Sequence, residues 1–203
     1  MRFRKVFILL LFLTAANLWA VPLRTQAAGQ KMDRFVNKLM SKMTIDEKIG
    51  QLNLVGAGDL SRGPISESGI ARAISKGQVG AILSLKGIQY IRELQKTAVE
   101  KSRLGIPLLF GLDVIHGYET TFPIPLAMSC SWDTSAIRKA ARIAAIEASC
   151  EGICWTFSPM VDICHDTRWG RIAEGAGEDP YLGSAIATAM VQGIRKICRP
   201  TRI

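Results

Sequence analysis

The sequence is poor in histidine, the usual base that activates a serine or cysteine nucleophile. It contains only two histidines, His116 and His165, which leaves little material for a Ser–His or Cys–His pair. No G-x-S-x-G nucleophile elbow is present. No G-x-G-x-x-G follows an apolar run either, because Ser61 stands where Gly56 and Gly58 would need a third glycine. These absences argue against Ser–His catalysis and against a dinucleotide site.

Metal-binding cysteine pairs are also absent. The five cysteines are odd in number and include no paired C-x-x-C spacing, which argues against a zinc site and against a fully paired disulfide framework. We interpret them as small buried apolar residues, although a bridge in an exported chain stays open. They are Cys130, Cys150, Cys154, Cys164 and Cys198.

The formal net charge of +9 does not indicate nucleic-acid binding. Eight of the 26 basic residues lie in residues 1–27 and 195–203, two segments that contain no acid. The remaining basic residues nearly balance the 17 acids. A nucleic-acid binder carries a basic face within its folded domain, so this class of partner is rejected.

Residues 1–27 have the order of a secretory signal peptide. Arg2, Arg4 and Lys5 precede an almost purely apolar run, and small residues at Ala20, Ala27 and Ala28 follow. The alternative is a membrane anchor, but the apolar run is short for a span. We therefore predict export to the periplasm or the cell exterior. No apolar stretch elsewhere reaches the ~18 residues of a spanning helix, so we expect no stable membrane insertion once the signal is removed.

The body of the chain alternates between strand and helix patterns. Apolar strands that alternate with amphipathic helices predict a parallel sheet with helices packed outside it, a pattern that barrel and doubly wound folds share. Thr44 and Glu47 form a capping box at the start of one helix. The predicted strands cover residues 51–55, 79–83, 106–114 and 153–163; the other helices cover 31–43, 70–75, 87–101, 134–149 and 182–194.

One polar cluster follows the strand predicted over residues 106–114. Asp113 and His116 come at its end, where a parallel barrel places its functional groups. A carboxylate in such a place needs partners, and the vicinal hydroxyls of a sugar can donate to it in pairs. The alternative is a structural Asp that caps the following loop, and position alone favours neither.

A second and richer cluster follows the strand predicted over residues 153–163. Arg168 and Arg171 flank Trp169, with Asp166 before them and Glu174 after. Arginine forks hold sugar hydroxyls or carboxylates, and tryptophan stacks on the apolar face of a pyranose. An ion-pair network that holds a long loop explains the same residues, so both interpretations stay open.

Four segments in order resemble glycoside hydrolase family 3. Gly111–Gly117 resembles its D-x-x-H-G segment, and Ser158–Arg171 its A-P-x-x-D-x-x-R-D-P-R-W-G-R segment. Glu174–Leu182 resembles E-x-F/Y-G-E-D-P-Y-L, and Met43–Leu52 resembles M-T-x-x-E-K-x-x-Q-L. Phe122 and Pro123 fit a T-x-F-P stretch. The match runs over about residues 31–194 without large gaps.

The resemblance implies an α/β fold, namely roughly the N-terminal half of a (β/α)8 TIM-type barrel over residues 28–194. It implies a retaining β-glucosidase that acts on a β-glucoside or oligosaccharide with two carboxyl groups, and neither a metal nor an organic cofactor. Asp113 and Arg171 would bind the sugar. The supporting loop residues would be His116, Arg168, Trp169 and Glu174. No oligomeric state follows.

Departures from the family pattern are small inside the match and large after it. His165, Thr167 and Ala176 replace the usual Arg, Pro and aromatic residue. Residues 195–203 form an aberrant basic tail, which we expect from a frameshift or premature stop, and the family's Lys-His pair, nucleophile and acid/base would lie beyond them. No catalytic residue is therefore assigned within the chain. A β-xylosidase, a β-N-acetylglucosaminidase or a non-catalytic sugar-binding remnant stay as alternatives.

Overall fold

The computed structural model describes residues 29–58 and 69–195. The predicted signal peptide, most of the loop predicted over residues 56–69 and nearly all of the basic tail lie outside the described residues. The chain divides into two compact units, Met1–Lys48 and Ile49–Ile203. Among the described residues, no helix is both long and apolar enough to cross a membrane.

The described part of the first unit is mostly helical, and its last helix, α2 (Ile45–Gln51), continues three residues past the end of the unit at Lys48. A helix covers residues 29–40, close to the predicted span, and α2 begins at Ile45 and ends at Gln51. The predicted capping box is confirmed: Glu47 Oε2 accepts from the Thr44 amide at 2.9 Å, and Thr44 Oγ1 accepts from the Glu47 amide at 3.2 Å. These two bonds satisfy amides that the first turn of a helix leaves free.

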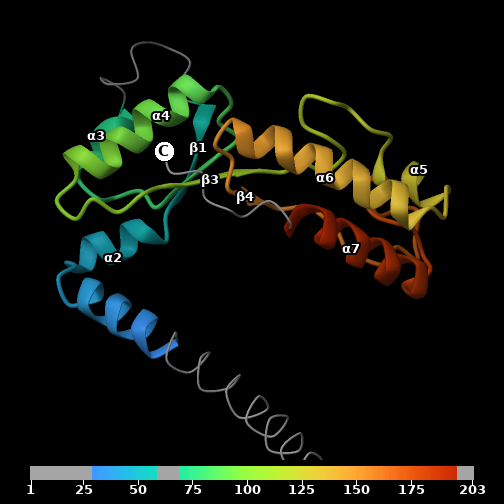
Figure 1. The fold of residues 1–203 in the computed structure, drawn as a ribbon, viewed down its shortest axis with the longest axis horizontal. Helices are drawn as coiled ribbons and strands as arrows, with labels where there is room; N and C mark the ends of the chain where they lie inside the picture. Colours follow the sequence, from blue (N-terminus) through green and yellow to red (C-terminus); the bar gives the residue numbers. More distant parts are fainter. Residues whose placement is uncertain (1–28, 59–68, 196–203) are drawn as a thin grey trace, which may run out of the picture. The chain divides into compact units, whose positions relative to one another are not determined.

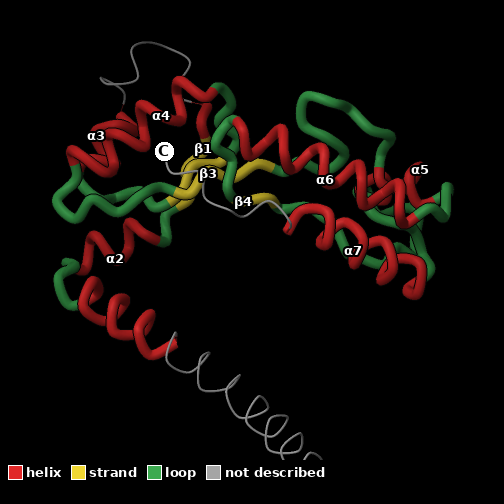
Figure 2. Tube along the Cα trace, viewed as in Figure 1, coloured by secondary structure: helices red, strands yellow, loops and turns green. Residues whose placement is uncertain are grey.

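The second unit is built on a four-stranded parallel sheet. Its strands are β1 (Leu54–Gly56), β2 (Ala81–Leu83), β3 (Leu109–Leu112) and β4 (Trp155–Thr156), paired in the order β1-β2-β3-β4 (Figure 2). A doubly wound sheet reverses its strand order at a switch point, whereas barrel strands follow one another in sequence. The observed order is that of a barrel, which resolves the choice left open by the alternating pattern.

Helices connect and cover the strands (Figure 1). Asp133 caps α6, accepting from the Ser135 and Ala136 amides at 2.9 Å each. Asp179 accepts from the Leu182 amide at 2.6 Å in the first turn of α7. The helical elements of this unit are α3 (Gly69–Ser75), α4 (Ile88–Lys96), the π-helix η3 (Thr97–Lys101), α5 (Pro125–Ser129), α6 (Thr134–Cys150), the 3-10 turn η4 (Ile172–Glu174) and α7 (Pro180–Arg195).

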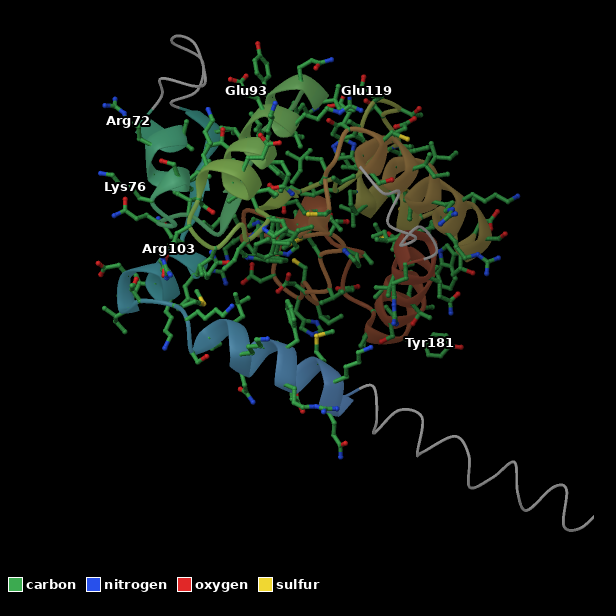
Figure 3. All side chains as sticks on the ribbon, turned by 60° about the vertical axis from the view of Figure 1, so that its left-hand side comes forward. Arg72, Lys76, Glu93, Arg103, Glu119 and Tyr181 are labelled. Atoms are coloured by element: carbon green, nitrogen blue, oxygen red, sulfur yellow. The ribbon has the colours of Figure 1, made fainter. Side chains whose placement is uncertain are left out.

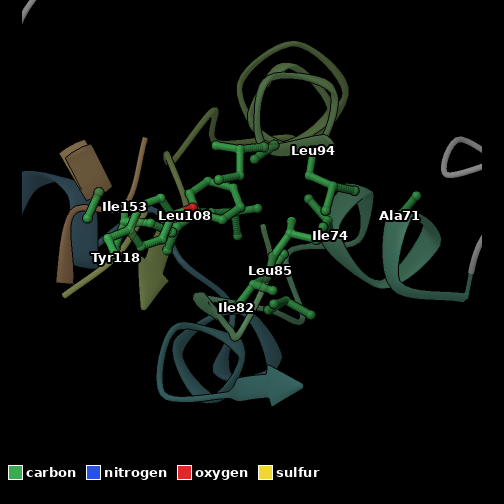
Figure 4. Packing of buried hydrophobic residues seen from close by; sticks show 13 residues of the cluster. Ala71, Ile74, Ile82, Leu85, Leu94, Leu108, Tyr118 and Ile153 are labelled. Carbon is green, nitrogen blue, oxygen red and sulfur yellow. The ribbon is translucent and has the colours of Figure 1, made fainter. Parts of the chain in front are cut away.

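The main core lies between the sheet and helices α3 and α4 (Figure 4). Ile82 of β2 and Leu94 of α4 are both 0% exposed, and Phe110 of β3 and Ile74 of α3 are buried with them. A second cluster joins α6 to α7 through Ile137, Ala141, Ile186 and Met190. The apolar spacing of α4 and α7 thus places Ile91, Leu94, Ile186 and Met190 in the core, whereas Met32, Phe35, Val36 and Met40 of the helix over residues 29–40 are exposed.

Several predicted boundaries differ from the structure. The strand predicted over residues 153–163 is limited to Trp155–Thr156, and Val161 is 63% exposed. Pro159 has no N–H for a sheet ladder, which explains why β-forming side chains beyond it lie in a loop. Residue 51 belongs to α2 rather than to β1, and the helix predicted over 87–101 changes to π geometry at Thr97. Neither α5 nor η4 was anticipated from the sequence.

Candidate functional site

The two polar clusters meet at one edge of the sheet. Asp113 directly follows β3, and the long loop over residues 157–179 follows β4. These strands are paired neighbours, with Gly111 opposite Trp155 and Leu112 opposite Thr156. The carboxyl ends of parallel strands share an edge, so the fold brings Asp113 and this loop together. Asp113 itself is exposed.

Arg171 is held by a forked ion pair. Its Nη2 lies 2.6 Å from Glu174 Oε2, and its Nε lies 3.1 and 3.2 Å from Oε1 and Oε2. The Met160 sulfur lies 3.8 Å from Nη2. Hydrogen bonds to Glu174 raise the pKa of Arg171 most, and the charges of Asp162 and Asp113 raise it further. Both aspartates are therefore within electrostatic reach of the guanidinium group.

Arg168 forms a separate pair with Asp166. Its Nε lies 2.9 and 3.0 Å from Oδ1 and Oδ2 of Asp166, Nη2 also contacts Oδ2, and the Arg168 amide donates to Oδ1 at 2.9 Å. These contacts lower the pKa of Asp166. Trp169 is half-buried next to this pair, and its amide donates to the Asp166 carbonyl at 3.1 Å. The pair shapes the turn that leads to Arg171.

His116 is fixed by the loop that follows it. Its Nδ1 lies 3.0 Å from the Phe122 carbonyl oxygen, and the Phe122 amide donates to the His116 carbonyl at 2.8 Å. A carbonyl oxygen only accepts, so Nδ1 carries the proton and Nε2 is left as the acceptor in the neutral ring. Gly117 forms an isolated antiparallel bridge with Thr121, which closes the turn between them.

The structure combines the two interpretations of the arginine-rich loop. Arg168 and Arg171 both belong to ion pairs, as the network interpretation expects, but only Arg171 lies within electrostatic reach of Asp113. Met160 and Asp162 also approach Arg171 and were not predicted as site residues. The sequence signal that could have indicated them is that both lie within Ser158–Arg171, the segment that resembles the family motif. The sugar-binding roles of Asp113 and Arg171 stay predictions.

The potential metal-ligating side chains and the cysteines are distributed over the described residues as follows. Among them, no group of three or more His, Cys, Asp or Glu side chains is placed to hold a metal ion. Cys130, Cys150, Cys154 and Cys164 are free thiols, and only Cys164 is buried, so the expectation that these four cysteines are buried is wrong for the other three. Cys198 lies outside the described part of the chain.

Comparison with known proteins identifies the family. The family model for the glycosyl hydrolase family 3 N-terminal domain matches residues 44–198. The chain belongs to this family. The implied partial TIM-type barrel is likewise confirmed by similarity to the β-glucosidase from Listeria innocua solved with isofagomine, which is 40% identical with a TM-score of 0.69, covering 79% of this chain and 22% of that one.

Two named relatives of this family 3 chain are β-glucosidases. A periplasmic β-glucosidase from Salmonella typhimurium is 44% identical over 163 residues, which cover 80% of this chain and 21% of that protein. A lysosomal β-glucosidase from Dictyostelium discoideum is 31% identical over 187 residues, covering 80% and 23%. The chain thus spans about a fifth of the length of the curated relatives it matches.

Proposed function

We propose that this chain is the glucose-recognising part of a β-glucosidase, with Asp113 and Arg171 as its sugar-binding residues. The observation that carries the proposal is that Asp113 follows β3 and the loop bearing Arg171 follows its paired neighbour β4, at the carboxyl edge of a barrel-type sheet, where the charge of Asp113 raises the pKa of Arg171. The exposed carboxylate accepts from sugar hydroxyls, and the guanidinium group donates to their oxygens. The Listeria innocua enzyme of the same fold has also been solved with glucose, at 39% identity and a TM-score of 0.69.

In this proposal, residues 1–203 bind the sugar but supply neither the nucleophile nor the general acid/base. A retaining glycosidase needs two carboxyl groups on either side of the scissile bond. Near Arg171 the carboxylates are Glu174, which the guanidinium holds as an ion pair, and Asp113 and Asp162. Hydrogen bonds from Arg171 lower the pKa of Glu174, which makes it a poor general acid at neutral pH.

The experiment compares binding with turnover. We expect calorimetry to detect glucose binding to the purified chain, with weaker binding of xylose and N-acetylglucosamine. We expect no p-nitrophenol release from p-nitrophenyl β-D-glucoside. Release that is lost on Asp113→Ala would show that a nucleophile lies within the chain, against this proposal. Preference for xylose or N-acetylglucosamine would instead support the corresponding family 3 activity.

We also propose that the chain is exported. The order of basic, apolar and small residues in positions 1–28 supports this, as does the name of the periplasmic relative from Salmonella typhimurium. Expression of the full chain in a Gram-negative host should give a product in the periplasmic fraction. N-terminal sequencing should place the cleavage after Ala20, Ala27 or Ala28. An uncleaved chain in the membrane fraction would support the anchor alternative instead.

A further inference from the structure

Two carboxylates, one in the last turns of α6 and one at its C-cap, bind the turn that follows His116. Glu147 Oε2 accepts from the amides of Glu119 and Thr120 at 3.0 and 2.9 Å, and its Oε1 accepts from the Thr120 hydroxyl at 2.6 Å. Glu151, four residues later at the C-cap of α6, accepts from the Tyr118 hydroxyl at 2.6 Å. Two acidic side chains on one face of a helix therefore receive four donors.

Glu151 also joins this turn to the start of α4. The same Oε2 atom accepts from the Gly87 amide at 3.0 Å, directly before the first residue of α4. Lys86 Nζ lies 4.7 Å from the centre of the Tyr118 ring, which is buried in the main core. A cation over an aromatic face and a charge-assisted hydrogen bond each favour this arrangement. The Tyr118 side chain is thus fixed at its hydroxyl and on its ring.

Both carboxylates stay ionised at neutral pH. Hydrogen bonds from the hydroxyl and amide of Thr120 lower the pKa of Glu147, and those from Tyr118 and Gly87 lower the pKa of Glu151. Burial, followed by the bond to Glu151, raises the pKa of the Tyr118 hydroxyl, so it remains a donor. The clamp formed by Glu147 and Glu151 therefore has charged acceptors and neutral donors, which is the stronger kind of hydrogen bond.

The clamped turn is continuous with the candidate site. His116 directly precedes the Gly117–Thr121 bridge, and Phe122 closes the loop by bonding to both the backbone and the ring of His116. Asp113 lies three residues before His116, so only a short segment of chain connects it to the turn. Residues 118–120, which α6 and its C-cap hold, thus lie only five to seven residues after Asp113 in the chain.

We propose that Glu147 and Glu151 are positioning residues for Asp113. Neither is placed against the sugar; each acts through the turn over residues 117–121. In this proposal, strand β3 holds the segment that carries Asp113 at its start, and α6 holds it further along, through the turn over residues 117–121. The inference rests on the proposed function, because a positioning role for Glu147 and Glu151 requires that Asp113 binds the sugar.

Binding and nuclear magnetic resonance together test the clamp. The chain has only two histidines, so the imidazole of each gives its own resonance, with His165 as the internal reference. We expect Glu147→Ala and Glu151→Ala to shift the His116 resonance, leave that of His165 in place, and weaken glucose binding on the order of tenfold. Glu147→Gln and Glu151→Gln keep a carbonyl oxygen where the amides donate, and should restore most of the affinity.

Two milder variants keep the test valid if an alanine variant does not fold. Tyr118→Phe retains the buried ring and removes only the hydroxyl that Glu151 accepts, and Thr120→Val removes only the hydroxyl bonded to Glu147. Each should shift His116 and weaken glucose binding a few-fold. The control is Glu93→Ala on α4, an exposed glutamate whose side chain lies at the surface, as Figure 3 shows, and it should change neither quantity.

The outcomes separate the two proposals. A shifted His116 resonance with unchanged glucose affinity would overturn the positioning role and leave the sugar site intact. An unshifted His116 resonance in all four Glu147 and Glu151 variants would overturn it as well. Failure of the unsubstituted chain to bind glucose would overturn the proposed function, and the positioning role with it, and this result is recognised before any variant is made.

Discussion

Asp113→Asn is expected to weaken glucose binding by at least about tenfold, because a hydrogen bond to a charged group contributes about 1.5–3 kcal/mol and each 1.4 kcal/mol changes affinity tenfold. The substitution keeps the shape of the side chain and removes its charge. One of its two acceptor oxygens becomes a donor, so it can no longer accept from two neighbouring hydroxyls. The exposed position of Asp113 means that the fold should not change.

Calorimetric titration with glucose measures this effect, and Asp33→Asn is the matched control. Asp33 is an exposed aspartate on the helix over residues 29–40, in the other compact unit, so the same chemical change should leave glucose affinity unaltered. Equal affinity of Asp113→Asn and the unsubstituted chain would remove Asp113 from the site. Equal weakening by both variants would point to a general effect of charge instead.

Much of the fold follows from local pattern. The capping residues Thr44, Glu47 and Asp133 fix helix starts because their side chains accept from amides of the first turn, a rule that depends only on neighbours in sequence. The strands were predicted in the right places but too long. A single apolar run does not show where pairing stops, since that depends on the partner strand and on residues such as Pro159.

The residues of the candidate site were likewise only partly predictable from the sequence. The sequence indicated Asp113 and Arg171 from strand ends and motifs, and the structure brings them within electrostatic reach. It did not indicate Glu147 and Glu151, because their donors lie 27–33 residues earlier in the chain or, for Gly87, 64 residues earlier. Two glutamates four residues apart normally indicate a solvent-exposed helix face. Only the tertiary structure shows that a loop donates hydrogen bonds to them.

Gly117→Ala is expected to disrupt the turn after His116. Gly117 has φ of +120°, a conformation that L-residues rarely adopt. A Cβ atom at this position would also lie 1.9 Å from the Thr120 carbonyl oxygen, so the backbone has to move. Strain of this kind costs on the order of 1–3 kcal/mol, and opening the turn at the Gly117–Thr121 bridge relieves it.

Opening that turn should affect the site more than the fold. The main core is centred on β2, β3 and α4, so far-ultraviolet circular dichroism should remain close to that of the unsubstituted chain. The Phe122 amide, bonded to the His116 carbonyl at 2.8 Å, should lose protection from hydrogen exchange, and glucose affinity should fall about tenfold or more. Gly56→Ala is the control, since a Cβ there meets no atom within 4 Å. Retained protection at Phe122 together with unchanged affinity would show that the geometry of this turn does not govern sugar binding, and the dependence of Asp113 on the loop behind it would have to be abandoned.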